Sequence, residues 1–229
     1  LKFIIEIDLI FPFIFMGLSQ IDKPLDKPTD LEETPANYKI NEIDLQRVKS
    51  LTSFGKKLLN EGHYEESLEP LKKAVTIQPK NPEIHFLLGL AYGALGQQSK
   101  KIQSYKETTR LNPKHAYALF KLGLSEAALS RHQQAISYYK DALYSDPFLP
   151  KANYFLALSY YLSGRFKEAL IPLKKELNLE PENPQIYYSL GLTYLRLGEY
   201  KKCLTPFKKA LSRKPNLLKE IAKANLANN

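Results

Sequence analysis

The stretch LNPKHAYALFKLGL, residues 111–124, has two near-copies in the same chain. IQPKNPEIHFLLGL lies upstream at residues 77–90, and LEPENPQIYYSLGL lies downstream at residues 179–192. The copies share a spacing that places a proline every 34 residues, at Pro79, Pro113, Pro147, Pro181 and Pro215. Repetition at such a period indicates an array in which each copy is one structural unit. The spacing therefore predicts five tandem repeats, at residues 48–81, 82–115, 116–149, 150–183 and 184–217.

Each repeat carries apolar residues at helical spacing in two successive segments. In the third repeat these are Leu119, Leu122 and Leu129, followed by Ala135, Tyr139 and Ala142. A turn residue separates the segments, namely Gly62, Gly96, Ser130, Gly164 or Gly198. The recurring proline ends the second segment, because proline lacks an N–H and disfavours helix at the residue before it. Each repeat is thus predicted to be a helix, a turn and a second helix.

A small residue recurs in every first helix, at Gly55, Gly89, Gly123, Ala157 and Gly191. A glycine such as Gly123 is expected to let the backbone of another helix come close, which a larger side chain would prevent. The order of a large residue, Leu-Gly, Tyr, Ala, an aromatic residue, Ala and Pro resembles the tetratricopeptide repeat. The fifth repeat supplies Tyr187, Leu190, Gly191, Tyr194, Phe207, Ala210 and Pro215, with Cys203 in place of the first alanine. The resemblance implies an all-α, right-handed superhelical solenoid of five helix–turn–helix repeats. It also implies that the first helices line a concave groove.

Several residues depart from the family pattern. Lys101 and Thr108 occupy small-residue positions of the second repeat, Glu176 occupies one in the fourth, and Glu126 replaces the usual tyrosine in the third. Lys101 must lay its methylene groups along the core and lift its ammonium group into water. We therefore expect the helix over residues 99–111 to be the least tightly packed. Cys203 is expected to be an inert, buried thiol.

The ends of the chain differ in composition from the array, which we place at residues 41–229. Residues 1–19 resemble a signal peptide: Lys2 precedes an uncharged run over residues 9–18, and Gly17 and Ser19 suit a cleavage site. The alternative is an apolar helix that packs on the body of the protein. Residues 20–40 are rich in proline and aspartate and predict a flexible linker. A signal peptide predicts a periplasmic or secreted bacterial protein with no membrane span in the mature chain, whereas its absence would leave a cytoplasmic one.

Array ends need polar caps, because a stacked repeat buries its apolar faces only against its neighbours. Residues 216–229 are predicted to form a C-terminal capping helix. At the other end, Asn41 is expected to cap the first helix and to extend it ahead of residue 48.

The sequence carries no signature of a catalytic nucleophile, a metal cage or a phosphate-binding loop. Its single cysteine excludes a disulfide framework, and its four histidines (His63, His85, His115 and His132) are scattered without paired spacing. The pattern favours a protein that is not an enzyme and that uses no cofactor or metal. The net charge of +9 is uneven, because residues 1–47 hold 5 basic and 9 acidic side chains.

One face of the first helices carries an apolar stripe with i, i+4 spacing. We call these ten residues the stripe: Phe86, Leu90, Phe120, Leu124, Tyr154, Leu158, Tyr161, Tyr188, Leu192 and Leu195. By resemblance to the family this face lines the groove, so the stripe is a candidate site for an extended peptide or a partner helix. We expect Phe120, Tyr154 and Tyr188 to be partly exposed. The alternative is that the stripe only packs adjacent first helices together.

Lysine pairs recur mainly on the second helices, at residues 72–73, 100–101, 174–175, 201–202 and 208–209. Their default interpretation is a solvated outer face. Nucleic acid is disfavoured as a partner, because aromatic residues are not interleaved with these lysines as a stacking platform requires. The leading hypothesis is a scaffold that holds a protein or peptide. The alternatives are a basic adaptor docked on an anionic membrane or nucleic acid, and a regulatory module of an enzyme on another chain.

Overall fold

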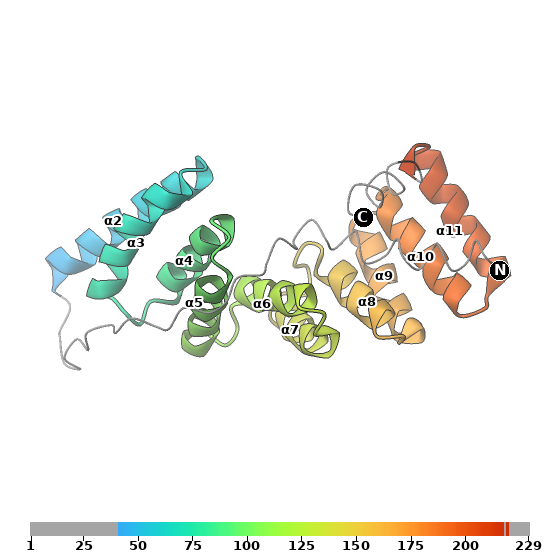
Figure 1. The fold of residues 1–229 in the computed structure, drawn as a ribbon, viewed down its shortest axis with the longest axis horizontal. Helices are drawn as coiled ribbons and strands as arrows, with labels where there is room; N and C mark the ends of the chain where they lie inside the picture. The colour runs from blue at the N-terminus through green and yellow to red at the C-terminus, as the bar shows by residue number, and fades with distance from the viewer. Residues whose placement is uncertain (1–40, 218, 220–229) are drawn as a thin grey trace. The chain divides into compact units, whose positions relative to one another are not determined.

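We describe residues 41–217 and residue 219 in a computed structural model of the chain. Within them the protein forms ten helices, α2 to α11, and no strand (Figure 1). None of these helices is long and apolar enough to cross a membrane. The predicted signal peptide, the predicted linker and most of the predicted capping helix lie outside the described residues.

The chain divides into two compact parts, whose boundary falls within α6 (Ala116–Ala128). The N-terminal part contains α2 (Glu42–Asn60), α3 (Tyr64–Ile77), α4 (Pro82–Ala94) and α5 (Gln98–Leu111). The C-terminal part contains α7 (His132–Ser145), α8 (Ala152–Leu162), α9 (Phe166–Leu179), α10 (Pro184–Arg196) and α11 (Tyr200–Arg213). The first helix packs against the second within a repeat, as α4 does against α5 and α10 against α11. In the third repeat, Phe120 of α6 packs against Tyr139 of α7.

The turns between paired helices require a left-handed residue. Gly62, Gly96, Gly164 and Gly198 all have φ between +71° and +84°. Ser130 takes the same place in the third repeat with φ of 57°, although its side chain disfavours this conformation. The predicted turn positions are therefore confirmed, including the one that lacks glycine.

Asparagine side chains cap the N-termini of three first helices, α2, α4 and α10. Asn41 accepts a hydrogen bond from the Asp44 N–H at 2.7 Å, and Asn81 and Asn183 each cap their helix in the same manner. This arrangement satisfies a backbone donor that the first turn leaves free. The predicted capping role of Asn41 is confirmed, and α2 begins at Glu42, ahead of residue 48.

The small residue of each first helix faces a large side chain of the second. A Cβ atom added at Gly123 would lie 2.5 Å from Cε1 of Tyr139, and one added at Gly191 would lie 2.6 Å from ring atoms of Phe207. We expected glycine to admit a neighbouring helix backbone. The structure shows that it admits a ring, and Tyr139 is consequently fully buried.

Helix α8 begins two residues later than the repeat register predicts. It starts at Ala152 rather than near Pro150, and its N-cap residue Lys151 is left-handed with φ of 64°. Glu176, which is 1% exposed, accepts a hydrogen bond from the Lys151 N–H at 2.9 Å. A carboxylate at a helix N-terminus satisfies a free donor and suits the helix dipole. The acidic residue at a small-residue position thus caps the first helix of its own repeat.

Candidate protein-binding surface

The exposure expected for three stripe residues is wrong. Phe120 and Tyr154 are each 8% exposed, and Tyr188 is 5% exposed. The cause is packing within the repeat: the Phe120 ring lies 5.8 Å from that of Tyr139, and the Tyr188 ring lies 5.7 Å from that of Phe207. These stripe aromatics therefore extend the seam that the small residues open between paired helices.

Adjacent first helices also meet along the stripe. Tyr154, Leu158 and Tyr161 of α8 face Ser189 and Thr193 of α10 across a contact that leaves no room for a water molecule. The two hydroxyl groups of α10 donate to carbonyl groups of their own helix, at 2.9 and 2.7 Å. Here the structure favours the packing interpretation of the stripe over the binding one.

Four stripe residues keep part of their surface. Leu192 is buried like its neighbours, but Phe86, Leu90, Leu124 and Leu195 are half-buried. Phe86 and Leu90 lie one turn apart on α4, and the Phe86 ring also packs 4.7 Å from that of His115. In the C-terminal part, Leu124 and Leu195 are the stripe residues that a partner could reach.

Burial also changes the acid–base properties of the stripe phenols. It raises the pKa of Tyr188 to about 12. Burial likewise raises the pKa of Tyr154. Both groups are therefore neutral at physiological pH and contribute no charge to the first-helix face.

The polar residues at core positions are accommodated in different ways. The Lys101 side chain packs over Gly93, where its Cδ atom would lie 3.1 Å from an added Cβ, so the prediction for its methylene groups is confirmed. Thr108 is fully buried and donates to the carbonyl of Ser104 at 2.9 Å. Glu126 is 8% exposed and pairs with Arg131 at 3.4 Å. The looser packing expected of α5 stays a prediction.

The lysine pairs all lie on second helices, namely α3, α5, α9 and α11, and all except Lys101 are exposed. Some already have partners: Lys73 pairs with Glu69 at 2.7 Å, and the Lys209 ammonium lies 5.3 Å from the centre of the Tyr187 ring. Exposed pairs of this kind contribute little to stability. These contacts reduce the number of lysines that are free to meet an anionic surface.

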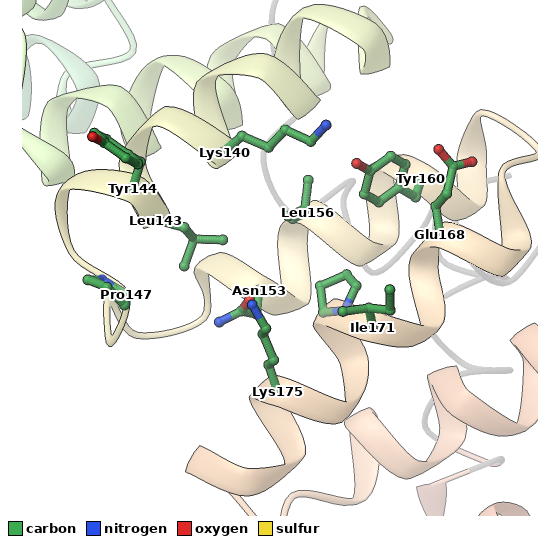
Figure 2. A pocket seen from close by; sticks show the side chains of 11 residues that line it. Lys140, Leu143, Tyr144, Pro147, Asn153, Leu156, Tyr160, Glu168, Ile171 and Lys175 are labelled. Carbon is green, nitrogen blue, oxygen red and sulfur yellow. The ribbon is translucent and has the colours of Figure 1, made fainter.

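A pocket of about 380 Å³ opens between α7 and α9, above α8, and the sequence did not predict it. We call it the α7–α9 pocket (Figure 2). It is lined by Lys140, Leu143, Tyr144, Pro147, Asn153, Leu156, Tyr160, Glu168, Ile171, Pro172 and Lys175. Its volume is near the lower end of the range found for small-molecule sites.

The pocket follows from one residue of the repeat register. Asn153 occupies the position that the family fills with a large side chain, where the fifth repeat has Tyr187. Both residues are buried, at 4% and 7% exposure, but the amide is much smaller than the phenol ring. In the fifth repeat the ring is covered by Arg213, whose guanidinium lies 4.7 Å from the ring centre. Comparing position four of every repeat would have singled out Asn153 from the sequence.

Arg165 lies beside Tyr160 and Glu168 of the pocket. Its guanidinium lies 4.7 Å from the centre of the Tyr160 ring and donates to Gln133 of α7 at 3.1 Å. It also donates through Nε to Glu168 at 3.0 Å, and this hydrogen bond lowers the pKa of the Glu168 carboxyl. The only carboxylate in the pocket lining is thus ionised and already paired.

The single cysteine lies on a second helix, α11. Cys203 is 5% exposed, as expected, and its thiol donates to the carbonyl of Tyr200. In the described part of the chain, no three histidine, cysteine or acidic residues gather as a metal site would require.

Family models match successive segments of the chain. A TPR repeat model matches residues 55–96, and two tetratricopeptide repeat models match residues 82–115 and 102–150. The model for anaphase-promoting complex, cyclosome, subunit 3 matches residues 137–210. Among curated proteins, none matches this chain.

Solved structures of MamA proteins share the fold. MamA 41-end from Desulfovibrio magneticus RS-1 is 20% identical, with a TM-score of 0.68 over 78% of this chain and 98% of that one. A second MamA structure is 26% identical, with a TM-score of 0.67 over 76% of this chain and 95% of that one. A third is 27% identical, with a TM-score of 0.65 over 72% and 96%.

These matches agree with the repeat register and with the paired helices of both compact parts. The turn glycines, the small residue against a second-helix ring and the recurring proline are the features on which the family pattern depends. The chain is a tetratricopeptide-repeat protein.

Proposed function

We propose that this protein is a non-catalytic scaffold that holds a peptide or a partner protein on the face of its first helices. Leu124 and Leu195 would supply contacts in the C-terminal part, and Phe86 and Leu90 in the N-terminal part. The observation that supports the proposal is that these four stripe residues stay half-exposed while their stripe neighbours are buried. The buried residues would hold the helices in place rather than touch the partner.

Photocrosslinking tests this assignment directly. A photoreactive amino acid at Leu124 or at Leu195 should crosslink one and the same partner. The same group at Tyr200, which is 62% exposed on the second helix α11, is the matched control and should not crosslink it. Crosslinking from Tyr200 alone would contradict the proposal.

The affinity of the scaffold should depend on apolar contact more than on charge. Replacing Leu124 and Leu195 together by serine should weaken partner capture by about 2 kcal/mol, the size expected for anchor residues. Capture should change little between low and high salt, whereas docking through the exposed lysines onto a membrane or nucleic acid should be lost at high salt. A steep salt dependence would favour the basic adaptor over the scaffold.

We also propose that the protein is exported to a bacterial cell envelope. Lys2, the uncharged run over residues 9–18 and the small residues Gly17 and Ser19 support this proposal. Protein purified from its native cell should then begin at Gln20 or close to it. Amino-terminal sequencing that finds residues 1–8 intact on the soluble cytoplasmic protein would contradict export.

A further inference from the structure

The α7–α9 pocket offers a surface whose chemistry differs from that of the stripe. Its floor is apolar and buried, with Leu156 and Tyr160 from α8 and Pro172 from α9. At its edge, Tyr144 is 83% exposed and Ile171 is 65% exposed. Large apolar side chains held in water beside a concave apolar surface are typical of a docking site.

A buried amide lies in the pocket. Asn153 is 4% exposed, and its side chain lines the cavity. A ligand that hydrogen-bonds to a buried polar side chain offsets the cost of keeping water away from it. An amide offers both a donor and an acceptor, so it matches the alternating N–H and carbonyl groups of a peptide chain.

Beside this amide, a proline leaves one main-chain carbonyl of α9 without its helical donor. Pro172 lies inside α9 and has no N–H, so the carbonyl of Glu168, one turn earlier, lacks its usual intrahelical donor. Both residues line the pocket. A peptide N–H could therefore donate to a main-chain carbonyl that helices normally use internally.

The charged side chains around the pocket indicate which groups a bound peptide should carry on either side of its apolar residue. Figure 2 shows Lys140 of α7 at the top of the pocket and Lys175 of α9 at the bottom, with Leu156 between them. Arg165 holds the Glu168 carboxylate. The Lys140 ammonium, which lies 5.7 Å from the centre of the Tyr160 ring, also helps to lower the pKa of that carboxyl. The two ammonium groups thus border an apolar concavity and favour a ligand with carboxylates on both sides of an apolar group.

We infer that the α7–α9 pocket docks an extended acidic segment of a partner protein, in which a leucine or phenylalanine is flanked on both sides by carboxylates. The apolar side chain fills the space that Asn153 leaves beside Leu156. The flanking carboxylates meet Lys140 and Lys175, and the segment's main chain pairs with the Asn153 amide. An anionic membrane offers the same charge but no side chain that enters the concavity.

The probe is the fluorescein-labelled peptide Asp-Glu-Leu-Phe-Glu-Asp, and fluorescence anisotropy measures its binding to the full chain. We expect saturable binding, and at least about tenfold weaker binding when serine replaces both apolar residues. Lack of saturable binding up to about 1 mM peptide overturns the inference. Equal binding of the serine peptide also overturns it, because attraction of charge alone would then explain the signal.

Reversing the charge of the two pocket lysines tests whether the peptide binds at the α7–α9 pocket. Lys140→Glu with Lys175→Glu should weaken binding at least about tenfold. The matched control is Lys201→Glu with Lys208→Glu, which makes the same change of charge at two exposed positions of α11 and should weaken binding less than about twofold. Equal losses in the two variants would show that net charge, rather than this pocket, attracts the probe, and would overturn the inference.

Apolar truncation tests the concavity without disturbing the core. Tyr144→Ala with Ile171→Ala removes exposed side chains at the edge of the pocket and should weaken binding at least about tenfold. The control, Tyr200→Ala with Leu204→Ala, removes side chains of α11 that are 62% and 57% exposed, and should have little effect. Equal effects of the two variants overturn the inference.

Filling the pocket from inside completes the test. Asn153→Leu should abolish binding while circular dichroism stays unchanged, and the edge variants decide the question if this variant does not fold.

Phosphatidylserine vesicles distinguish the membrane alternative. Vesicle binding that requires Lys140 and Lys175 but not Tyr144 and Ile171, without peptide binding, would assign the surface to lipid and overturn the inference.

Discussion

Repeats four and five begin their first helices in different ways. Helix α10 starts at Pro184, and the side chain of Asn183 accepts the Gln185 N–H at 2.9 Å. Helix α8 starts only at Ala152, after the left-handed Lys151, whose N–H donates to Glu176 from 25 residues further along the chain. In repeat five the first helix is capped by the residue just before it, Asn183. In repeat four the first helix is capped by Glu176, a residue of the second helix.

A departure from the repeat pattern can therefore be compensated within its own repeat. A carboxylate at a small-residue position would be destabilising in isolation, because burial disfavours its charged form. Glu176 instead replaces the asparagine cap that repeat four lacks. The two repeats also differ at position four, where Asn153 leaves the α7–α9 pocket and Tyr187 occupies the corresponding space.

The largest effect should come from the seam of repeat five. Gly191→Leu places a side chain where even a Cβ atom would lie 2.6 Å from the Phe207 ring. We expect a loss of about 2–3 kcal/mol in the free energy of unfolding, because the packed helices cannot separate freely. Urea denaturation measures it. Repeat four tolerates a Cβ at this position, since it has Ala157 there with the smaller Leu173 on the second helix.

The control for this variant is Lys201→Ala, an exposed change on the same helical hairpin, which should alter stability by less than about 0.5 kcal/mol. If the two variants unfold at the same urea concentration, Gly191 does not pack against Phe207 and the predicted seam of repeat five is wrong.

Removing the local cap should cost less. Asn183→Ala leaves the Gln185 N–H without its acceptor and should lower the free energy of unfolding by about 1 kcal/mol. Asn183→Ser retains an acceptor without adding a charge beside Glu180 and is the matched control, which should remain closer to the parent protein than the alanine variant. Thermal unfolding followed by circular dichroism compares them. Equal melting temperatures for all three proteins would show that α10 does not depend on this cap.

Repeat four should respond in the opposite direction to a change at its own N-cap. Lys151→Gly relieves the left-handed backbone at φ of 64° and should raise the free energy of unfolding by about 0.5–1 kcal/mol. Lys151→Ala keeps a Cβ atom at the same angle, so it should not show this gain. A glycine variant less stable than the alanine variant would mean that the Lys151 side chain, and not its backbone angle, controls the start of α8.

The smallest effect concerns the pH dependence of the Glu176 cap. Burial raises the pKa of Glu176 above its usual value of 4.5, and hydrogen bonds from backbone N–H groups at the start of α8 only partly oppose it. A carboxyl whose pKa rises on folding contributes stability that is fully present below its unfolded pKa and is lost as pH rises through its folded pKa. Glu176 should therefore stabilise the protein less at neutral pH than below pH 4.5.

Glu176→Gln isolates this contribution, because the amide keeps an acceptor for Lys151 but does not titrate. The stability of the E176Q variant relative to the parent should increase as pH rises above 4.5. Urea denaturation across this pH range measures the difference. A difference that shrinks with rising pH would mean that the cap interaction outweighs burial and that the pKa is lowered instead.

Most of the fold could be predicted from the sequence because its signals are local and occur five times. Helical spacing, the turn residue and the terminating proline act within one repeat, so even the turn at Ser130 was found by its place in the register. Glycine at the small position predicted a close approach, although the approaching group proved to be a ring of the second helix. Side-chain exposure was less predictable, since a stripe on one helix face looks alike whether it lines a seam or a surface.

The sequence alone determined the period, the paired helices, the cap at Asn41 and the burial of Cys203, because each depends on residues close in the chain or on a repeated position. Three features could be seen only in the folded protein: Phe120, Tyr154 and Tyr188 are packed, Glu176 caps α8, and a pocket opens above Asn153. Each of these depends on which side chains meet across a seam between helices. Such contacts join residues far apart in the chain, and they are set by the volumes of all their partners together rather than by any one position.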